Sequence, residues 1–390
     1  MGFILYVFWK ATQNPRAVAY LNGSCLQLIG YGAASNMEYF LSITVTTLAT
    51  AFVALLMLRP LSTRLGFVDI PNARTVHHGH VPNIGGLSVY LGMLAPVLFM
   101  DVDWQYQGLY ILGVSIMVLT GALDDLKELS AKSRLLVQAA VSLLMLVLAQ
   151  YPVSYLGEFP ILGTFNIGGL GYVVGVFAII GSINAFNMID GIDGLAGSVA
   201  LIALAQICLL LFIRGNTDLC LLALIVIVAL IPYLILNLGL WPFERKVFMG
   251  DAGVMFVGFT IAWLLINATQ SPSRYISPIS AFWIISLPFM DILEVIRTRL
   301  KQGKSPFQAD RQHIHHLFLN AGLPAKQALV AVLILATSTS GLGLVLELTG
   351  AKEWIMVLLF IILNAAYFHV KPHLGKLFKR WAVHPYPHDH

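Results

Sequence analysis

Charged residues are scarce in this sequence. Only 11% of its 390 residues are Asp, Glu, Lys or Arg, whereas 58% are hydrophobic. A soluble chain of this length would form two or three domains, and this composition excludes that class. It is the composition of a polytopic membrane protein.

Cysteine is nearly absent as well. The three cysteines, Cys25, Cys208 and Cys220, form neither a C-x-x-C pair nor an even-numbered framework. The sequence therefore indicates neither a thiolate metal site nor a disulfide scaffold, and we expect Cys208 and Cys220 to act as small apolar side chains in lipid.

Apolar runs of about membrane-spanning length recur along the chain. They lie near residues 38–58, 84–100, 108–123, 135–150, 168–186, 198–213, 219–238, 253–268, 276–296, 326–347 and 353–370. The sequence therefore predicts an all-α polytopic membrane protein with about eleven transmembrane helices in one domain, residues 37–370. Residues 1–36 are expected to be a poorly ordered extension, because "FILYVFW" is too short to span a membrane. Residues 371–390 are expected to form a cytoplasmic tail.

The basic residues fall mainly on one side of the membrane. With eleven spans and an outside N-terminus, 18 of the 23 Lys and Arg residues lie in inside segments and 5 lie outside. Because Lys and Arg in short loops are retained in the cytoplasm, this imbalance predicts the orientation. The formal net charge of +4 then reflects orientation and attraction to anionic lipid or phosphate. No nucleic-acid partner is expected.

Five inside segments carry most of the unusual polar chemistry. They read "VDIPNARTVHHGHVPNIGG" (68–86), "GALDDLKELSAKSR" (121–134), "NAFNMIDGIDGLAG" (184–197), "FERKVFMGDAGVMFVG" (243–258) and "GKSPFQADRQHIHHLFLNAGLP" (303–324). All five can converge on one cytoplasmic face. The sequence therefore predicts a single active site facing the cytoplasm.

The third segment sets polar side chains directly after an apolar run. Burial of such groups in hydrocarbon costs free energy. They therefore usually line a water-filled cavity, pair with one another or bind an ion. Asn184, Asn187, Asp190 and Asp193 are spaced three residues apart, so on a helix consecutive members are neighbours. The glycines between them would also permit a break in the helix. A capped helix end with Asp190 in the turn is the structural alternative.

Adjacent Asp124 and Asp125 end the third expected span, and Glu128 follows one turn later. Carboxylates this close repel one another, so they imply a cation, a shared proton or exposure to water. The nearby Lys132 and Arg134 favour a site for a metal and a polyphosphate over a solvated helix end.

Asp251 lies between two glycines in "MGDAG", just before a helix expected to begin near Val254. The free N–H groups of a helix N-terminus can bind an anion, and an adjacent Asp can hold Mg²⁺ against that anion. An Asp that only caps the helix is an equally good interpretation of this motif.

The segment "ADRQHIHHLFLNAGLP" predicts a short helix with Asp310 as its N-cap. His313 and His316 then share a face, while His315 points elsewhere. Together with Arg311 these histidines could bind zinc, but their spacing is not that of a structural zinc site. Hydrogen bonding to phosphate or sugar is the better interpretation, and a solvated amphipathic helix is the alternative.

Asp291, Glu294 and Arg297 follow one another at three-residue spacing near the inner end of a span. We interpret them as a ladder of side chains that pair with one another along the helix. Such pairing would allow charged residues to lie within a membrane-spanning helix. Asp291 could instead support a site residue, and the sequence does not separate the two.

With these motifs in view, the chain resembles the polyprenyl-phosphate N-acetylhexosamine-1-phosphate transferases. The resemblance covers about residues 37–367 and rests on the motifs "VDIPNARTVHHGHVPNIGG", "GALDDL", "INAFNMIDGIDGLAG", "KVFMGDAG" and "SPFQADRQHIHHL" in this order. The "HIHH" form resembles the bacterial N-acetylglucosamine branch, which acts on undecaprenyl phosphate. Two positions depart from the family pattern: Glu128 replaces the last aspartate of D-D-x-x-D, and Val254 replaces a frequent hydroxyl residue.

The resemblance implies transfer of N-acetylglucosamine 1-phosphate from its uridine diphosphate sugar to undecaprenyl phosphate, with release of uridine monophosphate (UMP). This reaction starts a cell-surface polysaccharide. The resemblance also implies a multi-pass protein of the bacterial inner membrane that depends on Mg²⁺, for which Mn²⁺ can substitute. It does not decide whether the protein is a homodimer. The alternatives are another UDP-N-acetylhexosamine donor, another membrane transferase or an ion-coupled transporter. Release of UMP from a uridine diphosphate sugar in membranes distinguishes this reaction from that of another membrane transferase and from transport.

The resemblance also implies roles for individual residues. Asp124 and Asp125 resemble the catalytic carboxylates, and Asp251 and Asn187 resemble the metal ligands. The implied substrate-binding residues are Asp190 and Asp193 near the uracil, together with Asn184, Lys132, Arg134, Arg311, His313, His315 and His316. Because a phosphate monoester has its second pKa near ~6, the acceptor needs little proton removal, which favours positioning as the role of the two carboxylates. A covalent route stays open.

Deletion of residues 1–36 is expected to leave transferase activity largely intact, because the resemblance begins near Met37. The check is activity per amount of inserted protein, measured in membranes. A deletion variant that inserts normally but is inactive would contradict this prediction.

Overall fold

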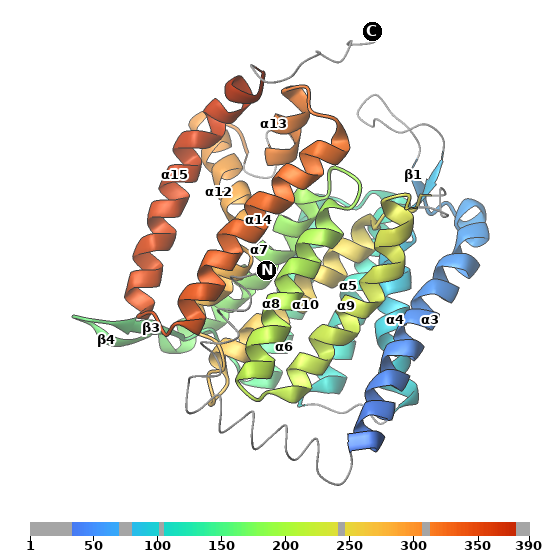
Figure 1. Ribbon diagram of the computed structural model, residues 1–390, viewed down its shortest axis with the longest axis horizontal. Coiled ribbons are helices and arrows are strands. Elements are labelled where there is room, and N and C mark those ends of the chain that lie inside the picture. Colours follow the sequence, from blue (N-terminus) through green and yellow to red (C-terminus); the bar gives the residue numbers. More distant parts are fainter. Residues whose placement is uncertain (1–32, 70–79, 101–104, 241–245, 306–312, 380–390) are drawn as a thin grey trace.

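The protein is a helical bundle with two short antiparallel strand pairs (Figure 1). The computed structural model describes residues 33–69, 80–100, 105–240, 246–305 and 313–379. In chain order the elements are α3 (Ala33–Leu65), β1 (Val68–Asp69), β2 (Val81–Pro82), α4 (Gly85–Phe99), α5 (Gln107–Lys127), α6 (Ala131–Ala149), β3 (Tyr155–Phe159), β4 (Gly163–Asn166), η1 (Gly168–Leu170), α7 (Gly171–Ile189), α8 (Leu195–Ile213), α9 (Thr217–Asn237), α10 (Gly250–Gln270), α11 (Pro278–Ile284), α12 (Ser286–Lys301), α13 (Ile314–Asn320), α14 (Ala325–Leu348) and α15 (Glu353–Lys379).

The expected apolar runs all fall on helices. Among the described residues, nine helices are long and apolar enough to cross a membrane, and α11 with α12, bent by 81°, would make a tenth. The remaining run, near residues 84–100, forms the shorter apolar helix α4 of 15 residues. Helices satisfy their own backbone groups, which a segment in lipid requires. The prediction of an all-α, multi-pass membrane protein is confirmed.

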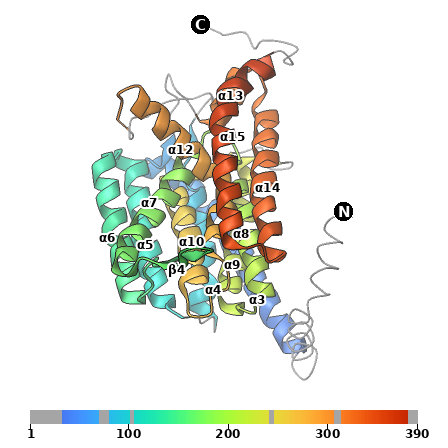
Figure 2. The ribbon, with the colours of Figure 1, turned by 90° about the vertical axis from the view of Figure 1, so that its left-hand side faces the viewer.

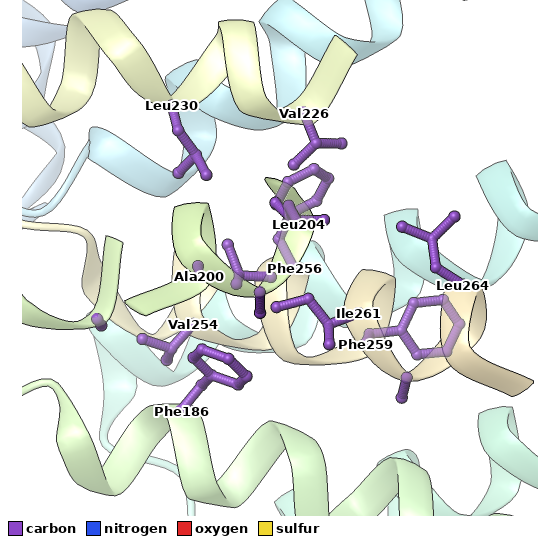
Figure 3. Packing of buried hydrophobic residues seen from close by; sticks show 14 of the residues in the cluster. Phe186, Ala200, Leu204, Val226, Leu230, Val254, Phe256, Phe259, Ile261 and Leu264 are labelled. Atoms are coloured by element: carbon purple, nitrogen blue, oxygen red, sulfur yellow. The ribbon is translucent and has the colours of Figure 1, made fainter. Parts of the chain in front are cut away.

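Helix α10 is the buried centre of the bundle and packs against α4, α5, α7 and α8. Every residue from Ala252 to Thr269 is buried. The helix is apolar around its whole circumference, and its Thr260 hydroxyl bonds inside the bundle to that of Tyr110 at 2.8 Å. A helix of this kind needs protein on every side. Figure 3 shows apolar side chains of α7, α8 and α9 directed toward it.

Small residues let two neighbouring helices approach α10 closely. A β-carbon on Gly86 of α4 would lie 2.1 Å from the backbone of Gly253, and one on Gly121 of α5 would lie 2.5 Å from the backbone of Ala252. Side-chain carbons do not approach backbone atoms this closely, so only glycine fits at either position. This packing fixes where α4 and α5 meet the start of α10.

The two ends of the bundle differ, as Figures 1 and 2 show: β1 and α13 lie at one end and the β3–β4 hairpin lies toward the other. At the hairpin end, buried Glu347 accepts a hydrogen bond from Ser280 at 2.7 Å and pairs with Arg214 at 3.3 Å. Glu353 accepts a hydrogen bond from the hydroxyl of Tyr155 at 3.1 Å. These carboxylates tie α14 and α15 to α8, α11 and β3.

Cys208 and Cys220 are half-buried free thiols on α8 and α9. Their sulfur atoms lie 3.1 Å apart. The two thiols therefore contact each other across the helix pair, and each takes part in the packing between these helices.

Gly121→Ala is expected to destabilise the protein by about 1–3 kcal/mol, because the added methyl group overpacks the contact between α5 and α10. Gly181→Ala is the matched control, since a β-carbon at Gly181 meets no atom within 4 Å. Thermal unfolding midpoints of the purified proteins in detergent check the prediction. An unchanged midpoint for Gly121→Ala would contradict the close packing.

Candidate active site

Two distant segments pair through their backbones at the start of α10. The N–H of Gly85 donates to the carbonyl of Phe248 at 2.9 Å, and the N–H of Phe248 donates to the carbonyl of Pro82 at 2.8 Å. One residue further along, Gly86 donates to the carbonyl of Met249 at 2.8 Å. The first and fourth sequence motifs therefore lie side by side, as the prediction of a single site requires.

The carboxylate of Asp125, on α5, caps the N-terminus of α10 from outside that helix. It accepts hydrogen bonds from the N–H groups of Asp251 at 3.0 Å and Ala252 at 3.2 Å. The amide of Asn83 donates to the same carboxylate at 3.3 Å. The anion cradle that the sequence predicts at this helix end is thus filled by an acidic side chain of the protein itself.

Asp251 lies inside the first turn of α10 and does not cap it. The N-cap residue is Met249, and the helix begins at Gly250. The predicted start near Val254 is wrong, because a carboxylate from another helix satisfies the first N–H groups and allows the helix to begin earlier. The interpretation of Asp251 as only an N-cap is also wrong, so its side chain is left for other contacts.

The side chain of Asp251 contacts residues of α7 and α6. The amide of Asn187 donates to it at 2.8 Å, and the guanidinium of Arg134 lies 3.9 Å from the same oxygen. Arg134 pairs more closely with Asp124, at 2.7 Å. The other oxygen of Asp124 accepts from the N–H of Leu129 at 2.7 Å. Asp124 therefore holds Arg134 beside Asp251.

Asp124, Asp125 and Asp251 form what we call the carboxylate cluster, and their negative charges outnumber the positive ones. Among the described residues, Arg134 is the one cation that forms an ion pair with the cluster, and the carboxylates are close enough to repel one another. A divalent cation relieves such repulsion. No three His, Cys, Asp or Glu side chains of the described ranges form a closed metal cage. Mg²⁺ does not require such a cage, because it commonly binds one or two protein ligands plus phosphates and water.

Helix α7 ends at Ile189, so the polar residues spaced by three do not form one helical row. Asn187 lies on the helix, whereas Asp190 and Asp193 lie in the turn that leads into α8. The prediction of a shared row holds only as far as Asn187. The glycines permit this break between α7 and α8. Gly194, the N-cap residue of α8, has a φ of +78°, which residues other than glycine rarely adopt.

Contacts with the segment before α10 hold this turn in place. Asp193 forms an ion pair with Lys246, and the N–H of Gly194 donates to the amide oxygen of Asn237. The amide nitrogen of Asn237 in turn donates to the carbonyl of Val247 at 2.7 Å. The turn is therefore fixed relative to the carboxylate cluster.

Asp190 is the exposed residue at the start of this turn. The negative charges of Asp251 and Asp193 act on its carboxyl group. Asp190 therefore lies within electrostatic reach of the carboxylate cluster, and the third motif belongs to the same site.

His315 is 1% exposed and lies against Gly191 of this turn. A β-carbon at Gly191 would lie 1.9 Å from its Nε2 atom, so a larger residue there would displace the His315 ring. Burial, and then the charges of His316 and His313, lower the pKa of His315 to about 3, so the ring is neutral at pH 7. Neither ring nitrogen has a hydrogen-bond partner among the described residues. Buried polar atoms without partners mark a place where a polar ligand could bind.

His313 is the N-cap residue of α13, and its Nδ1 atom lies 2.8 Å from the carboxylate of Asp291. Its ring stacks on that of His315, with 6.1 Å between centroids and 6° between planes. The ring of His316 lies 4.2 Å from that of His315. The prediction that His313 and His316 share a helical face is wrong, because the helix begins only at Ile314.

Asp291 contacts His313, one of the predicted substrate-binding residues. Glu294 pairs with Arg297 at 3.5 Å. The interpretation of a paired ladder is therefore correct for Glu294 and Arg297 and wrong for Asp291.

Two predicted substrate-binding residues of the described ranges, Asn184 and Lys132, do not join these contacts. Asn184 lies one turn deeper in the bundle, where its amide donates to Gln138 at 3.0 Å. Lys132 is exposed on the first turn of α6. Arg311 lies outside the described residues. The roles of these three residues in substrate binding stay predictions. The prediction of Asp310 as the N-cap of the short helix is wrong, because the N-cap of α13 is His313.

The sequence did not single out Asn83, Lys246 or Asn237. Asn83 and Lys246 lie inside two of the five polar segments, so their polarity within a motif was a usable signal. Asn237 ends the apolar helix α9 and carried no such signal, because its importance comes from its contacts with Gly194 and Val247.

Comparison with known proteins identifies the family of this chain. The model of glycosyl transferase family 4 matches residues 108–269. The undecaprenyl-phosphate alpha-N-acetylglucosaminyl 1-phosphate transferase of Salmonella typhi is 39% identical over 323 residues, which cover 82% of this chain and 87% of the relative. The proteins of that name from Escherichia coli K12 and Haemophilus influenzae are also 39% identical, over 78% and 87% of this chain and 83% and 96% of theirs. The chain therefore belongs to glycosyl transferase family 4, and its resemblance to the polyprenyl-phosphate N-acetylhexosamine-1-phosphate transferases is confirmed.

Proposed function

We propose that the protein transfers N-acetylglucosamine 1-phosphate from UDP-N-acetylglucosamine to undecaprenyl phosphate and releases UMP. The observation that carries this proposal is the carboxylate cluster, with Arg134 and Asn187, at one end of a membrane bundle. The relatives, whose names describe this transfer, support the same reaction. The lipid-linked product would start a cell-surface polysaccharide. We assign the protein to the bacterial inner membrane, with its site facing the cytoplasm.

The reaction is a substitution at phosphorus. An oxygen of the lipid phosphate attacks the phosphorus that carries the sugar, the bond from that phosphorus to the bridging oxygen breaks, and UMP leaves with the bridging oxygen and its electron pair. Because anionic phosphates must approach one another, catalysis depends on neutralising charge and on positioning. Arg134, held by Asp124 at 2.7 Å, supplies a fixed positive charge for this purpose.

The hydrogen bonds of Asp124 and Asp125 favour a positioning role for both. Asp124 is bonded to Arg134 and to the N–H of Leu129. Asp125 accepts from Asn83 and from two N–H groups of α10. Donors of this kind fix the orientation of a carboxylate. The acceptor phosphate, with a second pKa near ~6, needs little proton removal. We therefore assign this pair to orienting Arg134 and the start of α10.

Asp251 and Asn187 would hold the Mg²⁺ ion, which Mn²⁺ could replace. Their side chains already touch at 2.8 Å, and the excess negative charge around them favours a divalent cation. When bound, the ion would neutralise the donor diphosphate and polarise its oxygens.

The nucleoside end of the donor is assigned to the turn that carries Asp190 and Asp193. His315 supports this assignment, because its unpartnered Nε2 atom lies at the same turn. The pyrophosphate and the sugar are assigned, from the family resemblance, to Lys132, Arg134, Arg311, His313, His315 and His316, with Asn184 as a further substrate-binding residue.

Asp251→Asn is expected to lower turnover by orders of magnitude and to raise the Mg²⁺ requirement, since Asn offers a carbonyl oxygen in place of a full negative charge. Folding should be retained, because Asp251 caps no helix. Asp190→Asn is the comparison: a residue of the nucleoside pocket should weaken donor binding and leave the Mg²⁺ requirement unchanged. UMP release by the purified variants over a range of Mg²⁺ concentrations checks both.

Near-normal turnover of monodisperse Asp251→Asn, with an unshifted Mg²⁺ dependence, would contradict the metal assignment and remove the role of Asn187 with it. The same assay with other labelled UDP-N-acetylhexosamines tests the donor. Preference for another sugar would correct the substrate and keep the reaction. No UMP release from any of them would refute the transferase and leave an ion-coupled transporter as the alternative.

The cytoplasmic orientation of the site is tested by cysteine labelling in a variant without native cysteines. Lys132→Cys reports on the end that carries the site, and Ile161→Cys, at a hairpin residue that is 96% exposed, reports on the other end. In spheroplasts, a membrane-impermeant thiol reagent should label position 161 at once and position 132 only after permeabilisation. The reverse pattern would show that the site faces outward.

A further inference from the structure

Four donors converge on the carboxylate of Asp291, which is 2% exposed. Its Oδ1 atom accepts from the hydroxyl of Tyr367 at 2.8 Å and from the ammonium of Lys371 at 2.7 Å. The N–H of Ile314 also donates to it, at 3.1 Å, and Oδ2 lies 2.8 Å from Nδ1 of His313. Two of these partners lie on α15 and two lie at the start of α13. Asp291 thus joins the last helix of the bundle to residues 313–316, which we call the histidine segment.

Lys371 is a buried cation that completes this arrangement. It is 3% exposed, and its ammonium also contacts Glu294 at 2.8 Å. A buried ammonium requires such paired carboxylates, because the loss of hydration is costly. Residue 371 was expected to begin a cytoplasmic tail, yet α15 continues to Lys379 and Lys371 packs inside the protein. The end of α15 is therefore part of the structure around the site.

The bonds to Asp291 determine how α13 begins. With Lys371 beside it Asp291 is ionised, so Nδ1 of His313 is the protonated nitrogen that donates to it, and Nε2 is left for another partner. His313 stacks on His315. His315 lies against Gly191 of the turn that is assigned to the donor. A chain of direct contacts therefore leads from α15 to this turn.

We propose that Asp291, Tyr367 and Lys371 are positioning residues that hold the histidine segment, through His313, against the turn of residues 190–194. The end of α15 would then determine how firmly the nucleotide sugar is held, although none of the three positioning residues touches it. This inference rests on the proposed function of the site. If the network only joined α12 to α15, removing a donor would change stability and leave the use of the donor sugar unchanged.

Tyr367→Phe is the mildest test, because it removes one hydroxyl donor to Asp291 and keeps the ring. We expect kcat/KM for UDP-N-acetylglucosamine to fall about tenfold, as for the loss of one hydrogen bond to a charged group. The KM for the lipid acceptor should stay unchanged. Tyr110→Phe is the matched control, since it also removes a buried tyrosine hydroxyl, here one bonded to Thr260 in the middle of the bundle. It should leave kcat/KM unchanged and shift the thermal midpoint about as much.

A double-mutant cycle with His313→Ala decides whether the effect passes through His313. If it does, Tyr367→Phe causes no further loss of kcat/KM in the His313→Ala protein. If turnover of His313→Ala is too low to measure, calorimetric affinity for the donor sugar gives the same cycle. Lys371→Met repeats the test from the second α15 partner, and its effect should likewise vanish in the His313→Ala background.

Two results would overturn the inference while wild-type protein releases UMP normally. One is that Tyr367→Phe behaves like Tyr110→Phe in kcat/KM. The other is that the effects of Tyr367→Phe and His313→Ala simply multiply, which would make the network a structural connection only. Wild-type protein that released no UMP would instead refute the proposed function itself, and the inference with it.

Discussion

The candidate site depends on an imbalance of charge: three carboxylates meet at the start of a buried helix with one arginine beside them. Asp125 already accepts two N–H groups of the first turn of α10, so part of the positive end of this helix is paired with a carboxylate other than Asp251. The nearest partner of Asp251 is the neutral amide of Asn187. In the function that we propose, the missing positive charge is a divalent cation, and that cation in turn attracts the phosphates of the substrates. Metal dependence and a preference for phosphate substrates would then have one cause.

Packing keeps this unfavourable charge arrangement in place. Helix α10 is buried along its length, and close contact at Gly121, one turn before Asp125 on α5, sets the point where that carboxylate meets the helix end. Two further polar contacts fix what surrounds the cluster. Asn237 holds the turn after α7, and Asp291 holds the start of α13. The bundle therefore supplies rigid positions, and the site needs little rearrangement of its own backbone to bring its motifs together.

The sequence predicted the features that depend on residue type and spacing. Apolar runs predicted the helices, and the basic residues predicted that the polar motifs share one end of the bundle, which the contacts of Asp125, Asn187 and Asp251 confirm. The ends of individual helices were predicted poorly where contacts with residues distant in the sequence determine them. The start of α10 at Gly250 depends on Asp125, 126 residues away from Asp251, and no local pattern contains that contact. The sequence left the role of Asp291 open for the same reason, since its partners come from α13 and α15.

A donor-bound structure with Mn²⁺ in place of Mg²⁺ tests the central claim most directly, because anomalous scattering locates that ion. The account predicts Mn²⁺ in contact with Asp251 and with the diphosphate of the donor, while Asp125 stays bonded to the N–H groups of α10. A diphosphate bound directly to the start of α10, with Asp125 displaced and the cation elsewhere, would contradict it.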